Sequence, residues 1–94
     1  MRFERKNLAD LHPAEYNPRK KLTPEDPEYI QIRNSLTEFG YADPIVINAD
    51  GTIIKGHQRR TVMMDLGYTE AEVIVLDIPD KAKEKALNIA LNKI

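Results

Sequence analysis

Ile53-Ile54-Lys55-Gly56-His57-Gln58-Arg59-Arg60 is the stretch that decides the fold of this chain. The β-branched pair predicts the end of a short strand, and Gly56 predicts the turn from which a helix begins. The first turn of a helix leaves backbone N–H groups without intrahelical partners, and the helix dipole adds partial positive charge there. Two arginines add guanidinium groups to the same turn. The stretch therefore predicts a site that binds a phosphate group.

Length and composition indicate one globular domain. The chain has 94 residues, of which 41% are hydrophobic and 31% are charged. It contains no cysteine, which excludes disulfides, thiolate metal sites and cysteine nucleophiles. The net charge of −1 argues against a domain that binds nucleic acid through bulk charge alone. Neither an apolar run of about 18 residues nor a signal-peptide pattern is present, so we expect a cytoplasmic protein without membrane contact.

The N-terminal segment predicts a strand, a turn and a loop. Residues 3–8 predict a short edge strand, and residues 10–13 predict a turn. Two prolines between residues 13 and 18 indicate that residues 14–21 form a loop, whose end is basic. Two interpretations stay open for this end: a solvated basic loop, or a rigid Asn-Pro-Arg elbow that directs Arg19 across the domain.

The next segment predicts a helix that begins at either Thr23-Pro24 or Asp26-Pro27, because both pairs combine an N-cap residue with a proline. It is expected to run to about Phe39 and to end at Gly40. Its expected apolar face consists of Tyr29, Ile30, Ile32, Leu36 and Phe39.

A hairpin and a second helix follow. Residues 44–48 predict a strand, Asp50-Gly51 is a strong hairpin signal, and Ile53-Ile54 returns as the second strand. The hairpin leads directly to the helix of residues 57–66, which Gly67 ends. The expected core positions of that helix are Val62, Met63 and Leu66, with Met64 at the core edge. Residues 71–78 form the most apolar strand, and this continuous run predicts burial.

The last predicted helix covers residues 80–93, with Asp80 as its cap. One apolar stripe contains Ala82, Ala86, Ala90 and Ile94, with Leu87 and Leu91 beside it, and Ile89 lies away from this stripe. A second apolar edge on such a helix suits a following segment or a partner. We therefore expect residues 1–94 to form one domain, with a core of residues 3–78, at the start of a longer protein. The element order predicts a small α+β domain with a mixed sheet.

The order and spacing of several short motifs resemble a known family. These motifs are Asn17-Pro18-Arg19, Phe39-Gly40, Pro44-Ile45-Val46-Ile47, Asp50-Gly51, Ile54-Lys55-Gly56-His57-Gln58-Arg59-Arg60 and Leu66-Gly67. Together they resemble the ParB/sulfiredoxin-like fold, and more closely the ParB-like nuclease (ParB N-terminal) domain. The end of the chain, residues 86–94, is similar to the segment that follows this domain in phage-type and DNA-modification-associated members.

The resemblance implies roles for particular residues. In chromosome-partitioning ParB proteins a Gly-Glu-Arg-Arg motif holds the phosphates of CTP, and in sulfiredoxins Gly-Cys-His-Arg holds those of ATP. Gly56 and Arg59 match the shared ends of both motifs, and Arg19 matches the loop arginine of the family. Sulfiredoxin chemistry is excluded because His57 replaces the catalytic thiol. Asp43 replaces a glutamine of the partitioning proteins, and an acid there repels a triphosphate unless a metal ion lies between them.

Three hypotheses for function follow. The first is binding of a nucleoside triphosphate, with Mg²⁺ as its companion ion, or of a nucleic-acid backbone; its residues are Gly56, His57, Gln58, Arg59 and Arg19. Further contacts to nucleic acid are expected from Arg60, Lys20 and Lys55, because adjacent helix residues point about 100° apart and Arg60 then faces the surface.

The second hypothesis is a metal-dependent DNA endonuclease. His57 then acts as a general base or metal ligand, and Asp43 completes the site. The third is a recruitment module without chemistry, whose last helix binds a downstream domain or a second copy of the chain. The sequence leaves the whole question of catalysis open, since the other histidine, His12, lies far away along the chain.

Overall fold

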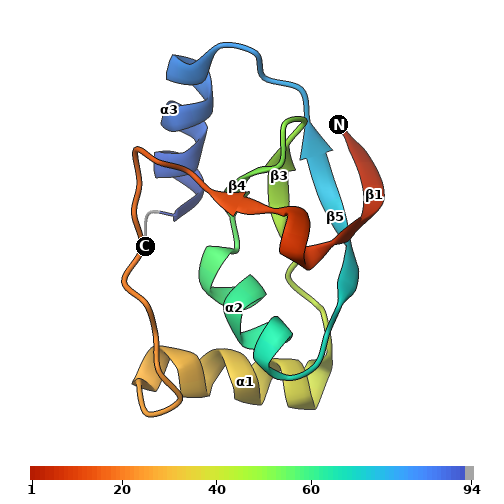
Figure 1. Cartoon of the computed structure of the whole chain (residues 1–94), viewed down its shortest axis with the longest axis vertical. Helices are drawn as coiled ribbons and strands as arrows, with labels where there is room; N and C mark the ends of the chain where they lie inside the picture. The colour runs from red at the N-terminus through yellow and green to blue at the C-terminus, as the bar shows by residue number, and fades with distance from the viewer. Residues whose placement is uncertain (93–94) are drawn as a thin grey trace.

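Five strands form one mixed sheet in the computed structural model of the chain, which describes residues 1–92 (Figure 1). Their bounds are β1 (Arg2–Asn7), β2 (His12–Pro13), β3 (Val46–Asn48), β4 (Thr52–Lys55) and β5 (Glu70–Leu76). The strand order is β1-β5-β3-β4-β2, with β1 at one edge as predicted. The β1–β5 and β3–β4 pairs are antiparallel, whereas β5–β3 and β4–β2 are parallel.

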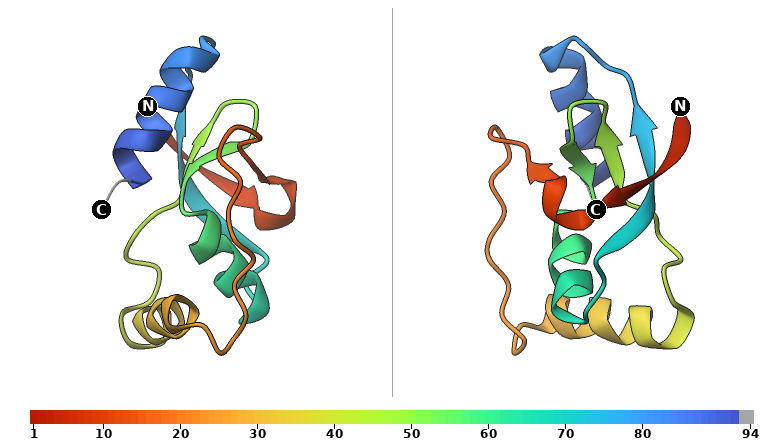
Figure 2. Two further views of the ribbon diagram at one scale, coloured as in Figure 1. Left: turned by 90° about the vertical axis from the view of Figure 1, so that its left-hand side faces the viewer. Right: turned by 45° about the vertical axis from the view of Figure 1, so that its right-hand side comes forward.

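Three α-helices pack on this sheet within residues 1–92, which confirms the predicted α+β class. They are α1 (Pro27–Phe39), α2 (His57–Asp65) and α3 (Lys81–Asn92), and a 3₁₀ turn, η1 (Leu8–Asp10), follows β1. α3 packs against β4, whereas α1 and α2 pack against each other at the other end of the molecule (Figures 1 and 2). None of these helices is long and apolar enough to cross a membrane.

The β3–β4 hairpin delivers the chain to the start of α2. The N–H of Gly51 donates to the carbonyl of Asn48 at 2.9 Å, and Gly51 has a φ of 91°, which favours glycine. Gly56 stands between β4 and α2 with a φ of 103°. A Cβ atom at Gly56 would lie 3.0 Å from Cγ1 of Ile45, so any other residue at this turn is strained.

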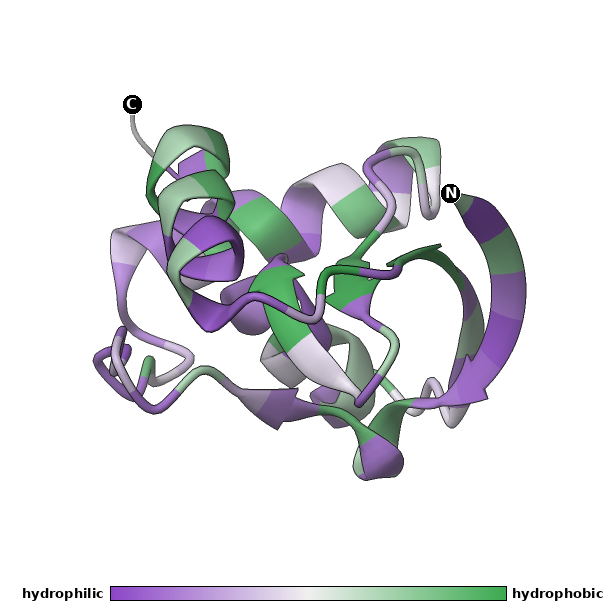
Figure 3. Cartoon of the chain, turned by 90° about the horizontal axis from the view of Figure 1, so that it is seen from above, coloured by the Kyte–Doolittle hydropathy of each residue, from purple (hydrophilic) through white to green (hydrophobic). Residues whose placement is uncertain are grey.

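The core lies between the sheet and α1 and α2. Buried hydrophobic side chains come from η1, α1, the β3–β4 hairpin, α2 and β5, and they include Leu8, Leu36, Ile45, Ile47, Val62, Met63, Val73 and Val75. In Figure 3, hydrophobic (green) segments run along the central strands, whereas α3 carries both green and purple bands.

Two local predictions near the N-terminus are resolved by backbone hydrogen bonds. The predicted turn at residues 10–13 is wrong at its end, because His12–Pro13 forms β2, and the N–H of His12 donates to the carbonyl of Gly51 at 3.1 Å. α1 begins at Pro27, with Asp26 as its N-cap residue. The Asp26 carboxylate instead accepts the N–H of Thr23 at 2.7 Å, so the Thr23-Pro24 pair forms the preceding turn.

Several apolar positions are more exposed than their spacing predicts. Phe39 is 70% exposed and Leu66 is 43% exposed, because each lies where its helix ends. Met64 is also exposed. β5 is an alternating strand rather than a continuously buried one: Ala71, Val73 and Val75 are buried, and Ile74 is half-buried.

α3 differs most from its prediction. Asp80 caps the helix as expected, accepting the N–H of Ala82 at 2.9 Å. Its buried residues, however, are the polar Glu84 and Asn88, whereas Ala82, Ala86 and Ala90 are exposed. The inward side is polar because β4 and the loop after β2 offer it hydrogen-bond partners. Lys93 and Ile94, which the prediction placed in this helix, lie outside the described residues.

Candidate functional site

Most of the residues that the sequence singled out line one cavity of about 370 Å³. We call it the Gly56 cavity. β4 and the start of α2 supply Lys55, Gly56, His57, Gln58 and Arg59. Arg19 comes from the loop after β2 and Asp43 from the segment before β3, while Glu28, Ile32, Leu91 and Asn92 complete the lining.

The backbone at the start of α2 contributes donors to this cavity. The first intrahelical bond of α2 runs from the N–H of Arg60 to the carbonyl of Gly56 at 2.9 Å. Among residues 1–92, no side chain makes a capping hydrogen bond to the helix N-terminus. The N–H groups of the first turn therefore have no intrahelical acceptor, and they carry the positive end of the helix dipole.

Two cations of the cavity are paired with one carboxylate. Lys55 Nζ lies 2.8 Å from Oδ1 of Asp43, and an Arg59 guanidinium nitrogen lies 3.7 Å from Oδ2. The Arg59 side chain is only 16% exposed, so its charge is partly shielded from water. Arg19, by contrast, has no side-chain ion pair or hydrogen bond within residues 1–92.

His57 is held in its neutral form. Burial lowers its pKa, and the charges of Arg19 and Arg60 lower it further, since each disfavours a second positive charge nearby. Its Nδ1 is buried and has no hydrogen-bond partner among the described residues. His57 therefore offers a neutral ring nitrogen rather than a cation at the cavity wall.

The loop that carries Arg19 is fastened at two points. Asn17 donates from its side-chain amide to the side-chain oxygen of Asn88 on α3. Gln58 donates from Nε2 to the carbonyl of Lys20 at 2.8 Å. Gln58 thus acts on the loop backbone, and together the two bonds set where Arg19 enters the cavity.

α3 contributes residues that sequence reasoning missed. Asn92 lines the cavity and donates to the carbonyl of Ile54 at 2.6 Å, one turn beyond Asn88. The i, i+4, i+8 spacing of Glu84, Asn88 and Asn92 was the available signal, because such a stripe lies on one helix face. It was overlooked in favour of the apolar residues.

Two of the expected nucleic-acid contacts lie outside the cavity. Arg60 differs from the expected free surface cation, because its Nε donates to the carbonyl of Leu8 at 2.6 Å and the side chain is partly buried. Lys20 is exposed, and its Nζ lies 3.7 Å from a carboxylate oxygen of Asp26. Lys55 is the one of the three that lines the cavity.

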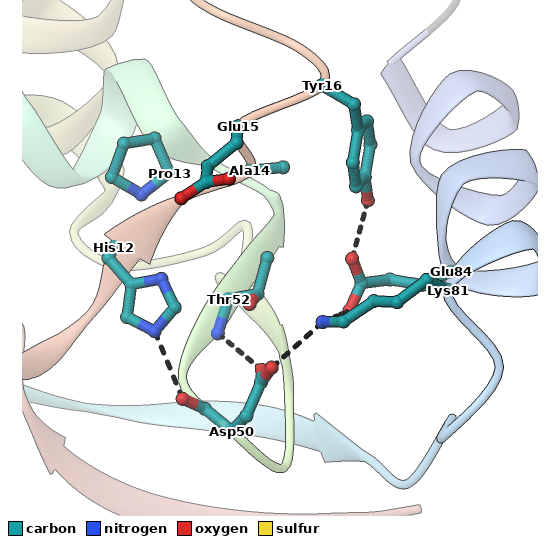
Figure 4. A pocket seen from close by; sticks show the side chains of 9 residues that line it. All are labelled: His12, Pro13, Ala14, Glu15, Tyr16, Asp50, Thr52, Lys81 and Glu84. Atoms are coloured by element: carbon teal, nitrogen blue, oxygen red, sulfur yellow. Dashed lines mark hydrogen bonds and ion pairs between the residues drawn. The ribbon is translucent and has the colours of Figure 1, made fainter.

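A second cavity of about 440 Å³ lies near the other end of α3, and we call it the Glu84 cavity (Figure 4). Glu84, which is 0% exposed, is one of the residues that line it. The Glu84 carboxylate accepts from Tyr16 Oη at 2.8 Å, Asn48 Nδ2 at 2.6 Å and Lys81 Nζ at 3.1 Å. Apart from the polar stripe on α3, the sequence gives no sign of this cluster.

The Glu84 carboxylate of this cavity is paired with three donors. Burial raises the pKa of Glu84, but the three donors outweigh burial and hold that pKa below its ordinary value. Burial, and then the bond to the Glu84 carboxylate, raise the pKa of Tyr16 to about 12. Lys81 also pairs with Asp50 at 2.9 Å, and the carbonyl of Asp50 lies 3.0 Å from His12 Nε2.

Neither cavity presents a ready metal centre. No group of three or more His, Cys, Asp or Glu side chains within residues 1–92 is arranged to hold a metal ion. Asp43 and His57 line the same cavity, but Asp43 is occupied by two cationic side chains. A divalent ion at this site would have to arrive with a ligand that supplies further oxygen atoms.

Two curated proteins are similar to this chain in sequence. An uncharacterized protein, ORF326b, of Acidianus two-tailed virus is 31% identical over 71 residues, which cover 73% of this chain and 22% of the viral protein. The ParB-like nuclease domain-containing protein YnaK of Escherichia coli strain K12 is 32% identical over 79 residues, which cover 83% of this chain and 87% of YnaK. The chain thus spans about a fifth of the first relative and most of the second.

Solved structures share the fold. The Pnob8-like ParB-N domain matches 97% of this chain with a TM-score of 0.76 at 20% identity, over 37% of its own length. A C-terminally truncated chromosome-partitioning protein ParB from Caulobacter crescentus, complexed with CTP-gamma-S, matches 100% of this chain with a TM-score of 0.73 at 18% identity. The match covers 54% of that protein. The same partitioning protein has also been solved with the centromeric parS site, with a TM-score of 0.70.

A family model confirms the relationship across the whole domain. The model of the ParB N-terminal domain matches residues 3–92, which include every element of the sheet and all three helices. It also includes the motifs whose order pointed to this family, from Asn17-Pro18-Arg19 to Leu66-Gly67. The chain therefore belongs to the ParB N-terminal domain family.

Proposed function

We propose that this domain binds a phosphate-bearing ligand, a nucleoside triphosphate or a nucleic-acid backbone, in the Gly56 cavity. The observation that carries the proposal is the meeting of Arg19, Arg59 and the uncapped N-terminus of α2 around one space. Guanidinium groups and first-turn N–H groups are the donors that phosphate oxygens prefer. The domain would act in a DNA-related process such as partitioning, modification or transcription regulation, and hence in the cytoplasm.

Each residue has a distinct task in this proposal. Gly56 adopts the left-handed conformation that turns the chain from β4 into α2 against Ile45, and this turn presents the first N–H groups of α2. Arg59 from α2 and Arg19 from the loop after β2 supply two-pronged donors. Gln58 and Asn17 hold the loop that carries Arg19, and Lys55 adds a third positive charge. The partitioning protein from Caulobacter crescentus, which shares this fold, was solved in complex with CTP-gamma-S. This supports a nucleotide as the first ligand to test.

The test is a calorimetric titration with CTP, ATP and a short DNA duplex, with and without magnesium. Arg59→Ala is expected to weaken binding about 10- to 100-fold, because a charge-assisted bond contributes about 1.5–3 kcal/mol. Arg5→Ala is the matched control, since it removes an exposed arginine from β1 far from the cavity. Equal binding by the wild type and Arg59→Ala would contradict the proposal.

A metal-dependent DNA endonuclease is the second candidate. It is favoured by His57, whose pKa is lowered, and Asp43, which line the same cavity, and by the E. coli relative, a ParB-like nuclease domain-containing protein. A general base must be unprotonated at working pH, and the lowered pKa of His57 meets that condition. Cleavage of a DNA duplex with Mg²⁺ or Mn²⁺, lost in His57→Ala, would establish this function; no cleavage with either ion rejects it.

A recruitment role is the third candidate, favoured by the exposed apolar side of α3. Ala82, Ala86 and Ile89 face away from the sheet there. A downstream domain of the same protein or a second copy of the chain would cover this side. Ile89→Lys would then abolish a dimer seen by sedimentation while leaving ligand affinity unchanged, and a monomeric wild type would leave no support for the homodimer.

A further inference from the structure

Asp43 occupies the place where an incoming anion would sit in the Gly56 cavity. Its two carboxylate oxygens are divided between two cations: Oδ1 lies 2.8 Å from Lys55 Nζ, and Oδ2 lies 3.7 Å from an Arg59 guanidinium nitrogen. All three side chains line the cavity. A phosphate group binds such a pair through the same kind of contact, with oxygens shared between an ammonium and a guanidinium.

Asp43 is also able to leave this place. Its side chain is 48% exposed, and its segment lies between the end of α1 and the start of β3, outside any helix or strand. An ion pair that is half open to water is weak, because water competes for both partners. An anion of higher charge can therefore displace the carboxylate without breaking the fold.

We propose that Asp43 competes internally for the phosphate position and thereby selects ligands with a terminal phosphate or a polyphosphate chain over phosphodiesters. This inference rests on the proposed phosphate-binding function and names its ligand class. A phosphodiester carries one negative charge, as Asp43 does, so exchanging one for the other gains no net attraction. A terminal phosphate carries about 1.5 to 2 negative charges near pH 7, and a polyphosphate carries more.

The charge of the remaining lining strengthens this selection. Glu28 adds a second carboxylate, so the three cations Arg19, Lys55 and Arg59 face two acids within one cavity. A singly charged ligand meets this acid pair with little net positive charge to attract it. A polyphosphate is long enough to contact Arg19 as well, and Arg19 has no competing carboxylate within residues 1–92.

The experiment compares the wild type with Asp43→Asn, which keeps the shape of the side chain and removes its charge. The probes are sodium tripolyphosphate and a thymidine dinucleotide with one phosphodiester, each followed by amide NMR shifts. Asp43→Asn is expected to bind tripolyphosphate about 3- to 10-fold more tightly, as removal of two half-exposed ion pairs allows. We expect no detectable binding of the dinucleotide to the wild type and measurable binding to Asp43→Asn. The preference for tripolyphosphate over the dinucleotide should therefore be smaller in the variant.

Glu28→Gln is the matched control, because it removes the same charge from the same cavity but has no ion pair within residues 1–92. It should change tripolyphosphate affinity less than Asp43→Asn does. An equal effect of both variants would show that Asp43 acts only through its negative charge in the cavity. That result would overturn the proposal that Asp43 competes for the phosphate position. A thermal unfolding curve first checks that both variants are folded.

The remaining outcomes separate this inference from the function beneath it. Unchanged affinity in Asp43→Asn, with Arg59→Ala still weakening binding, rejects the competition and keeps the phosphate site. Weaker binding by Asp43→Asn, only when Mg²⁺ is present, shows that Asp43 holds a metal ion for the ligand and overturns the competition. Binding of neither probe by any variant removes both proposals together.

Discussion

The two cavities of this domain lie near opposite ends of α3 and differ in how their charges are satisfied. In the Glu84 cavity the buried carboxylate accepts from three donors, and its neighbours bond to one another (Figure 4). In the Gly56 cavity three cations meet two carboxylates, Arg19 has no side-chain partner within residues 1–92, and Nδ1 of His57 is unpaired. The Glu84 carboxylate is therefore satisfied by neighbouring side chains, whereas the Gly56 cavity has donors left for a ligand.

This difference suggests which cavity stabilises the fold and which is the better candidate for a ligand site. A buried polar network whose members are all paired stabilises the fold, and it loses free energy when any member is removed. Unpaired donors in a partly buried space are costly unless a ligand satisfies them. Cavity size alone would favour the Glu84 cavity, because it is the larger of the two.

The largest effect is expected from Glu84→Ala, which should lower the free energy of unfolding by about 2–3 kcal/mol, since it leaves buried donors without an acceptor. Urea unfolding measures the loss. Lys85→Ala, an exposed change on the same helix, should have little effect. A loss no greater than that of the control would show that the Glu84 network does not stabilise the fold.

The next effect is expected from Gly56→Ala. A non-glycine residue at a φ of 103° costs about 1–3 kcal/mol, and the added Cβ would lie 3.0 Å from Ile45. Gly67→Ala is matched, because its φ is 99° and nothing lies within 4 Å of its Cβ position. Gly56→Ala should therefore cost more in urea unfolding and should also weaken ligand binding. Equal losses of stability in Gly56→Ala and Gly67→Ala would show that the contact with Ile45 adds no cost.

A smaller effect is expected from Asn88→Ala. The Asn88 side chain connects the two cavities. The change removes the acceptor for Asn17 and frees the loop that carries Arg19. Stability should fall by about 1 kcal/mol, and tripolyphosphate should bind several-fold more weakly. Asn34→Ala, on the exposed side of α1, is the control. Unchanged ligand affinity would show that the cavities work independently.

The smallest effect concerns the protonation of His57. Its lowered pKa means that folding favours the neutral ring. The contribution of His57 to the stability of the fold is therefore present above pH 6.5, and it is lost as the pH falls through the pKa of the folded state. An NMR titration should place its midpoint below 6.5. Tripolyphosphate should raise that midpoint in the wild type, because an anion favours the protonated ring. A midpoint that does not move with bound ligand would place the anion away from His57.

Much of the fold was predictable because local signals agreed. Asp50-Gly51 marked the hairpin, Gly56 marked the start of α2, and Asp80 marked the start of α3. The short strand β2 was missed, because two residues that pair with β4 have no periodicity to detect. The packing face of α3 was also missed, since a rule that places apolar residues inside fails where carbonyls and side chains offer hydrogen bonds to a polar stripe.

The candidate site was predictable to a similar degree. A contiguous motif and one arginine at a proline-defined elbow foretold which residues line the Gly56 cavity, although their roles stay predictions. The hydrogen-bond partners of Asn88 and Asn92 could not be predicted, because they depend on how α3 packs against β4. Arg60 showed the converse: its sequence position suggested a surface cation, but its contact with Leu8 exists only in three dimensions.

The pairing of β1 with β5 bears on how the chain reaches this structure. Arg2 lies opposite Val75, and Asn7 lies opposite Glu70, so the first strand has no partner in the sheet until residues 70–76 have been synthesised. During synthesis the hairpin and α2 can form early from neighbouring residues, but the sheet closes only after β5 has left the ribosome. Such distant pairing slows folding, and it leaves the nascent edge of β1 dependent on its polar, charged residues to stay apart from other chains.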